Sequence, residues 1–196
     1  MPTEEIRTDH TILGIDPGTN VMGFAVLKTH LRNSEIVTLN VVKMNRAADQ
    51  SAKLKQIYES TLELIETYHP DTLAIEEPFY GKNPQSMLKL GRAQGVVIGA
   101  CLHAGLEVFE YPPRRVKQAI TGKGGASKEQ VAAMLHHMYD FTPETNYLDA
   151  TDALGIAVCH HLQNRIDLGA SSRAKANSWE AFLTLNQDRI IRGSSK

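Results

Sequence analysis

Four carboxylates of this 196-residue chain fall where buried elements are expected to begin or end. Asp16 follows the apolar run "TILGI", Glu76 follows "TLAI", and Asp149 and Asp152 precede "ALGIAVC". Crowded carboxylates raise one another's pKa unless cations neutralise them. Hard divalent ions prefer oxygen ligands, and two of them about 3.5–4 Å apart can activate a water and stabilise the leaving oxygen of a phosphodiester. The set therefore indicates metal-dependent phosphodiester hydrolysis, if the fold brings the four side chains together.

Each acidic position also has a purely structural interpretation. An aspartate before Pro-Gly, as in "IDPGTN", is a common turn residue. An isolated D-x-x-D at a helix start is explained more simply by Asp149 as an N-cap and Asp152 as a first-turn acid that favours the helix dipole. The occurrence of three such places in one chain, two at strand ends and one at a helix start, favours the catalytic interpretation.

The elements that must position these side chains form an α/β pattern. Three strands separated by short turns predict an antiparallel meander, and two further strands each follow a helix, so they should pair in parallel. The predicted mixed sheet comprises "TILGID" (11–16), "MGFAVLKT" (22–29), "EIVTLNVVK" (35–43), "TLAIE" (72–76) and "LEVFEY" (106–111).

Strand parity predicts which carboxylates share a face of that sheet. Successive side chains of a strand point to opposite faces. Asp16 therefore shares its face with Gly14, and Glu76 shares its face with Ala74. Small neighbours leave room on this face, so Glu76, rather than Glu77, is the better partner for Asp16 if the two strands are adjacent.

Helical spacing predicts a helix capped by Asp49, a second from Pro84 to Ala104, and a short one that ends near Gly122. Ser127 and Gln130 form a capping box for the next helix. The last long helix begins near Asp149 and continues to Ile166.

We predict one domain over residues 1–167, followed by a tail over 168–196. The tail begins with the linker "LGASSRAKANS" and ends in a peripheral element that docks through Trp179, Phe182 and Leu183.

Composition excludes several other classes of protein. No apolar run approaches the roughly 18 residues needed to cross a bilayer, and the N-terminus has no signal-peptide order, which predicts a cytoplasmic protein without a membrane partner. Cys101 and Cys159 lack a C-x-x-C partner, which favours buried reduced thiols over zinc ligands. Two adjacent histidine pairs, 136–137 and 160–161, are expected at helix surfaces.

The net charge of −1 gives no signal for nucleic acid over the whole chain, but its distribution does. The segment 82–128 contains eight basic and two acidic residues, a pattern that fits a phosphate-facing region and fits an ordinary solvated surface equally well. Its basic residues are Lys82, Lys89, Arg92, Arg114, Arg115, Lys117, Lys123 and Lys128.

Taken together, four motifs resemble the RuvC-type Holliday junction resolvases, which are members of the ribonuclease H-like superfamily. They occur in the family's order and spacing over residues 11–162. The motifs are "ILGIDPGTNVMGFAVL", "LAIEEPFYGKNPQSMLKLGRAQGV", "VFEYPPRRVKQAITGKGGASKEQV" and "DATDALGIAVCHH".

The resemblance implies a ribonuclease H-like fold and an endonuclease that resolves Holliday junctions by paired nicks with 5′-phosphate and 3′-hydroxyl ends. It implies two Mg²⁺ ions per active site, which Mn²⁺ can replace. The metal ligands would be Asp16, Glu76, Asp149 and Asp152, and Lys117 and Lys128 would support cleavage beside the scissile phosphate.

The resemblance also implies a set of DNA contacts. Phe79 matches an aromatic residue that stacks on bases near the crossover, whereas pattern alone would equally make it a core residue. Tyr80 adds a second aromatic side chain. The remaining DNA-binding candidates are Lys82, Lys89, Arg92, Arg114, Arg115 and Lys123.

Gly91, Gly95 and Gly99 recur at four-residue spacing in the second helix, where each costs about 1 kcal/mol of helix propensity against alanine. Packing on the chain's own sheet should account for part of this stripe. The resemblance implies that the helix also contributes to a homodimer, which would place two active sites on a two-fold symmetric junction. The family further implies the RuvA–RuvB branch-migration complex as a partner.

Two alternatives belong to other functional classes. A phosphotransferase of the actin and sugar-kinase type has a similar D-x-G-T turn, but it needs a second, repeated half that 196 residues without an internal repeat leave little room for. A non-catalytic junction-binding protein would keep the basic segment but has no reason to keep four carboxylates.

Overall fold

The computed structural model describes residues 9–30, 33–78, 83–139, 141 and 148–174, with side chains described as far as Gln163. Five strands form one sheet in the order β3-β2-β1-β4-β5. The β1–β2 and β2–β3 pairs are antiparallel, and the β1–β4 and β4–β5 pairs are parallel, so the predicted mixed sheet is confirmed. The strands are β1 (Asp9–Asp16), β2 (Val21–His30), β3 (Asn33–Lys43), β4 (Thr72–Glu76) and β5 (Glu107–Tyr111).

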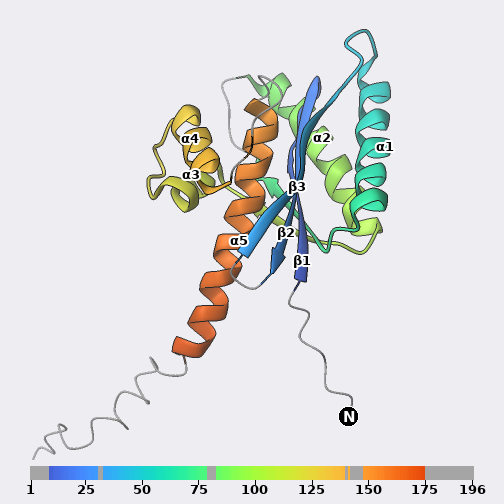
Figure 1. Ribbon diagram of the computed structural model, residues 1–196. Helices are drawn as coiled ribbons and strands as arrows, with labels where there is room; N and C mark the ends of the chain where they lie inside the picture. Colours follow the sequence, from blue (N-terminus) through green and yellow to red (C-terminus); the bar gives the residue numbers. More distant parts are fainter. Residues whose placement is uncertain (1–8, 31–32, 79–82, 140, 142–147, 175–196) are drawn as a thin grey trace, which may run out of the picture. The chain divides into compact units, whose positions relative to one another are not determined.

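Helices cover both faces of this sheet. The ribbon places α1 and α2 on one side and α3, α4 and the first half of α5 on the other (Figure 1). No helix in the described ranges combines the length and the apolar character needed to span a bilayer. The bounds are α1 (Gln50–Tyr68), α2 (Pro84–His103), α3 (Pro113–Thr121), α4 (Lys128–Met138) and α5 (Leu148–Ala174).

Local signals set several of these boundaries as expected. The Asp49 side chain accepts a hydrogen bond from the Ala52 backbone N–H and caps α1. Ser127 and Gln130 form the predicted capping box of α4. Gly122 ends α3 with φ 73°, a left-handed conformation that glycine adopts without a steric cost.

The main core lies between the sheet and helices α1 and α2. Odd-numbered residues of β1 and β4 point to this side, as strand parity requires. The buried core includes Leu13, Ile15, Leu73 and Ile75 of these strands, with Ile57 and Leu64 of α1 and Ala93, Val97 and Cys101 of α2.

The opposite face is nearly flat at its centre, so that α5 can lie close to it. A Cβ added to Gly14 would be 2.4 Å from the Ala153 carbonyl oxygen and 2.9 Å from the Ala157 Cβ. The helix is also covered on its far side, where Val116 and Ile120 of α3 pack near Gly155. This part of α5 is apolar around its whole circumference, because it is buried between the sheet and the α3–α4 pair.

The histidine prediction is wrong for one pair. His160 and His161 are buried, whereas His136 and His137 are exposed as expected. The His160 Nδ1 lies 2.7 Å from the Tyr111 hydroxyl oxygen, and burial, with smaller effects of His10 and His161, lowers the pKa of His160 to about 4. The buried apolar run "ALGIAVC" of α5 leads directly into these two residues, so the pair lies on the part of the helix that is enclosed by the core.

The chain divides into two compact units, residues 1–161 and 162–196. The linker predicted from Leu168 is wrong over its first part, because α5 continues to Ala174. Good helix formers in "LGASSRA" sustain the helix despite Gly169. The domain boundary after Asp167 stays a prediction. The peripheral element with Trp179, Phe182 and Leu183 lies outside the described residues.

The approach of α5 to the sheet can be tested at Gly14. We expect Gly14→Ala to lower the free energy of unfolding by about 1–3 kcal/mol, because the added methyl group overlaps the α5 backbone. Gly125→Ala is the control, since a Cβ there meets no described atom within 4 Å. Urea unfolding measures both variants, and an equal effect of the two substitutions would contradict the packing argument.

Candidate active site

Asp16 and Glu76 stand at the carboxyl ends of neighbouring parallel strands. The β1–β4 register pairs Gly14 with Ala74 and ends at Ile15 with Ile75, so the two acidic residues follow directly on adjacent strands. Both are partly buried, and both project to the face that α5 covers. The parity prediction is therefore confirmed for this pair.

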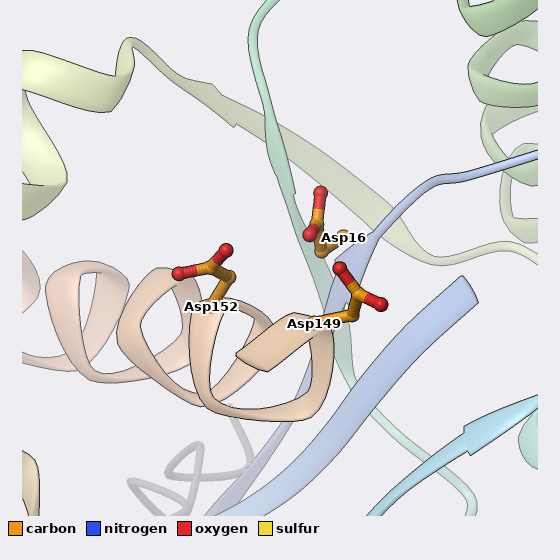
Figure 2. A group of neighbouring side chains, drawn as sticks. All are labelled: Asp16, Asp149 and Asp152. Carbon is orange, nitrogen blue, oxygen red and sulfur yellow. The ribbon is translucent and has the colours of Figure 1, made fainter. Parts of the chain in front are cut away.

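The first turn of α5 brings two more carboxylates to the same place. Figure 2 shows Asp149 and Asp152 on this turn with Asp16 on the strand beside it. Gly23, which pairs with Asp16 across β1 and β2, makes this approach possible. A Cβ at Gly23 would lie 2.0 Å from the Asp149 carbonyl oxygen, so any larger residue would push the start of α5 away.

One carboxylate oxygen from each of Asp16, Asp149 and Asp152 lies within 4.8 Å of the other two. Glu76 is outside this tight group but close enough to act on its charges. The four residues are called the acidic cluster below. Oxygen atoms at this spacing suit a hard divalent cation, so the donor set fits the metal that the sequence predicts.

Burial and mutual repulsion make the metal-free cluster unfavourable in its fully ionised form. Burial raises the pKa of Asp16 to about 8, with further contributions from the charges of Glu76, Asp152 and Asp149. Burial also raises the pKa of Glu76, followed by the charge of Asp152. Such a site gains most from a bound cation, because the cation removes both the repulsion and the need for a proton.

Two lysines supply positive charge at the edge of the cluster. Lys128, at the start of α4, forms an ion pair with Asp152. Burial lowers the pKa of Lys128, but the hydrogen bond and charge of Asp152, with the charges of Asp16 and Glu76, outweigh burial and raise it. Lys117 on α3 is near enough to Glu76 to oppose the rise of its pKa. Lys128 is therefore cationic beside the carboxylates.

A cavity of about 490 Å³ opens between these lysines and the carboxylates. Its lining includes charged groups and apolar ones. The charged groups belong to Glu76, Asp152, Lys117, Lys128 and Arg114, and the apolar ones to Val116, Val131 and Ile156. The cavity gives a substrate access to the cluster from the side of α3 and α4.

The other predicted DNA-binding residues are spread more widely. Arg114 contributes to the cavity lining. Arg115 and Lys123 are exposed on α3 and just after it, and Lys89 and Arg92 are exposed on α2. Phe79, Tyr80 and Lys82 lie outside the described residues.

Gly23 shapes the site and was not predicted to do so from the sequence. Its signal was present, because counting back across the "PGTN" turn pairs Gly23 with Asp16 in the hairpin register. What the sequence could not indicate is that the backbone of α5, rather than a side chain, occupies the space above it.

A model of the family described as "Crossover junction endodeoxyribonuclease RuvC" matches residues 12–160. Curated relatives with that name include one from Cytophaga hutchinsonii, 47% identical with 93% of this chain and 88% of the relative covered, and one from Bacteroides fragilis, 46% identical with 91% and 95% covered.

Solved structures agree with these sequence relatives. The structure titled "T. thermophilus RuvC in complex with Holliday junction substrate" has a TM-score of 0.75 and 30% identity, covering 81% of this chain and 96% of that one. The yeast mitochondrial Holliday junction resolvase Ydc2, with a TM-score of 0.62, 13% identity, and 81% and 80% covered, shares the fold.

The raised pKa of Asp16 predicts a pH dependence of stability for the metal-free protein. The pKa of its carboxyl group is 3.8 in the unfolded chain and about 8 in the fold. Between these two pH values the folded state therefore binds more protons than the unfolded state. The contribution of Asp16 to the free energy of unfolding is therefore most favourable below about pH 3.8, and it is lost as the pH rises to about 8.

We therefore expect Asp16→Asn to reduce the fall in Tm of the chelator-treated protein between pH 5 and pH 8. Asp49→Asn is the matched control, because asparagine also caps a helix and the charges that raise the pKa of Asp16 do not include Asp49. Thermal unfolding followed by circular dichroism measures the difference. Parallel pH profiles for wild type and Asp16→Asn would refute the assignment of the raised pKa.

Proposed function

The chain belongs to the RuvC family of crossover junction endodeoxyribonucleases, and we propose that its acidic cluster is the centre at which it hydrolyses the strands of a four-way DNA junction. The chain is thus a junction-resolving endonuclease, and family membership decides against the phosphotransferase alternative. The observation that carries the assignment of the site is the convergence of Asp16, Asp149 and Asp152 within 4.8 Å beside a cationic lysine.

The cluster would hold two Mg²⁺ ions, or Mn²⁺ in their place, through the carboxylates of Asp16, Glu76, Asp149 and Asp152. When bound, these ions would supply a water with a lowered pKa and stabilise the charge of the leaving oxygen. The pKa of Asp16, about 8 without metal, supports this proposal, because the deprotonated cluster needs positive charge to exist at neutral pH.

The chain's own residues complete the chemistry. Asp16 and Glu76, fixed at strand ends, and Asp149 and Asp152, fixed on a buried helix, would be ligands with little freedom to move. Lys128, paired with Asp152, would donate hydrogen bonds to the phosphate that enters the cavity. Lys117, across the cavity, would bring a second positive charge to the same phosphate.

DNA outside the scissile phosphate would follow the exposed basic residues. Arg114 lines the cavity, Arg115 and Lys123 are exposed on α3 and just after it, and Lys89 and Arg92 are exposed on α2. Contacts of this kind attract the phosphate backbone without reading its sequence. We assign Phe79, with Tyr80 and Lys82, to the junction crossover.

A second copy of the chain would cover the exposed face of α2. This glycine face consists of Leu88, Gly91, Gly95, Gly99 and Leu102. A Cβ on any of the three glycines would meet no described atom within 4 Å. The prediction that packing on the chain's own sheet explains part of the stripe is therefore wrong. Leu88 and Leu102 are 65% and 58% exposed.

At 100° per residue, the five positions fall within about 80° of the helix circumference, opposite the buried Val97. Two such faces would pack backbone to backbone, with leucines at either end. A symmetric dimer would bring two acidic clusters to the two symmetric strands of a junction. The RuvA–RuvB branch-migration complex and a cytoplasmic location complete the proposal.

Cleavage by the acidic cluster can be tested with a synthetic four-way junction and Mg²⁺. We expect wild type to give ligatable nicked duplexes, and Asp16→Asn to bind the junction but to cleave it roughly 100-fold more slowly or worse. Asp49→Asn should cleave at the wild-type rate, because its carboxylate lies at the cap of α1. Cleavage by Asp16→Asn at the wild-type rate would refute the proposed site.

The glycine face can be tested by Gly95→Glu, which places a charge where the second copy would pack. We expect sedimentation to give the monomer mass and the variant to make single rather than paired nicks. Lys55→Glu introduces the same side chain on exposed α1 and should stay dimeric. A dimeric Gly95→Glu variant would show that the interface lies elsewhere.

A further inference from the structure

A buried glutamine of α2 bonds to the backbone of the strand end that carries Glu76. Gln94 is 3% exposed, and its side-chain Nε2 lies 2.9 Å from the Glu76 carbonyl oxygen and 2.9 Å from a carboxylate oxygen of Glu110. Both partners are acceptors, so the amide nitrogen, with its two hydrogens, must face them. Both N–H groups of the Gln94 amide therefore donate to residues at the ends of β4 and β5.

The Glu76 carbonyl needs such a donor because of Pro17. The Glu77 N–H donates to the Tyr111 carbonyl oxygen of β5, at 2.9 Å. The Glu76 C=O and the Glu77 N–H belong to one trans peptide group and point in opposite directions, so the Glu76 carbonyl faces β1. Continuing the register beyond Ile15 and Ile75 makes residue 17 the next donor on β1. Residue 17 is a proline, which has no N–H.

This gap in the ladder occurs beside the acidic cluster. Pro17 turns β1 away immediately after Asp16, and the turn removes the backbone bond that would fix Glu76 on the adjacent strand. An unpaired buried carbonyl costs free energy and leaves its residue free to shift. The Gln94 amide supplies the missing bond from the opposite side of the sheet.

We propose that Gln94 is a positioning residue that sets the place of Glu76 in the acidic cluster. The Gln94 side chain also links the end of β4 to α2. Gln94 is the immediate neighbour of Gly95, which belongs to the glycine face. Assembly on that face and the geometry of the cluster thereby share one rigid helix. The inference rests on the proposed role of Glu76 as a metal ligand.

Gln94→Met tests this role, since methionine has a similar shape, cannot donate and changes no charge. We expect cleavage at saturating junction to slow by about tenfold to 100-fold, because small displacements of reacting groups have effects of this size. The Mg²⁺ concentration for half-maximal cleavage should rise. Junction affinity and the dimer mass should stay as in wild type.

Glu110→Ala is the matched control, because it removes the other acceptor of Gln94 and leaves the bond to the Glu76 carbonyl. It should keep the wild-type Mg²⁺ requirement. Wild-type rate and Mg²⁺ requirement in Gln94→Met would overturn the proposal, and so would an equal loss in Glu110→Ala. In either case an inactive Asp16→Asn leaves the proposed function standing.

Pro17→Ala provides a second test, since it returns an N–H to the position that faces the Glu76 carbonyl. A positioning role predicts that Gln94→Met slows cleavage by a smaller factor in the Pro17→Ala background than in wild type. Equal factors in both backgrounds would assign Gln94 to packing alone and overturn the proposal. If Gln94→Met does not fold by itself, the double variant is compared with Pro17→Ala, and a tenfold or larger difference has the same meaning.

Discussion

The repulsion among partly buried carboxylates is the constraint on which the rest of the structure depends. Asp16, Asp149 and Asp152 are held closer than free carboxylates would settle, and burial of Asp16 makes its ionised form still more costly. The fold must therefore supply rigid supports from elements that are stable without the site. Strand ends and a buried helix do this, because their positions follow from the hydrophobic core and the hydrogen-bonded sheet.

Close approach between backbones provides the needed short distances. Gly14 and Gly23 lie under α5, so the helix rests on the sheet nearly without intervening side chains. The Asp149 carbonyl would occupy the place of a Cβ on Gly23, the neighbour of Asp16 across the hairpin. The removal of two methyl groups from the sheet thus brings the first turn of α5 within reach of β1.

Charge and support are divided between the two faces of the sheet. On the α5 face, Lys117 and Lys128 offset part of the negative potential and leave a cavity open for an anionic substrate. On the other face, α2 reaches the backbone of Glu76 through Gln94 and presents glycines outward. Both helical layers therefore contact the strand ends that carry the acidic cluster, and the layer remote from the carboxylates also carries the exposed glycine face.

The sequence by itself determined the strands, their parity and the helix caps, because period and capping are local: Asp16 and Glu76 could be placed on one face before any contact was known. Family motifs added the expectation that the D-x-x-D pair binds metal. Only the tertiary structure decided that Glu76 lies just outside the tight group of three, that His160 is buried and that the glycine face is open. It alone paired Gln94 with a carbonyl that Pro17 leaves without a donor. These features depend on how far apart separate elements lie and on which side each is covered, and no local pattern of residues encodes that distance.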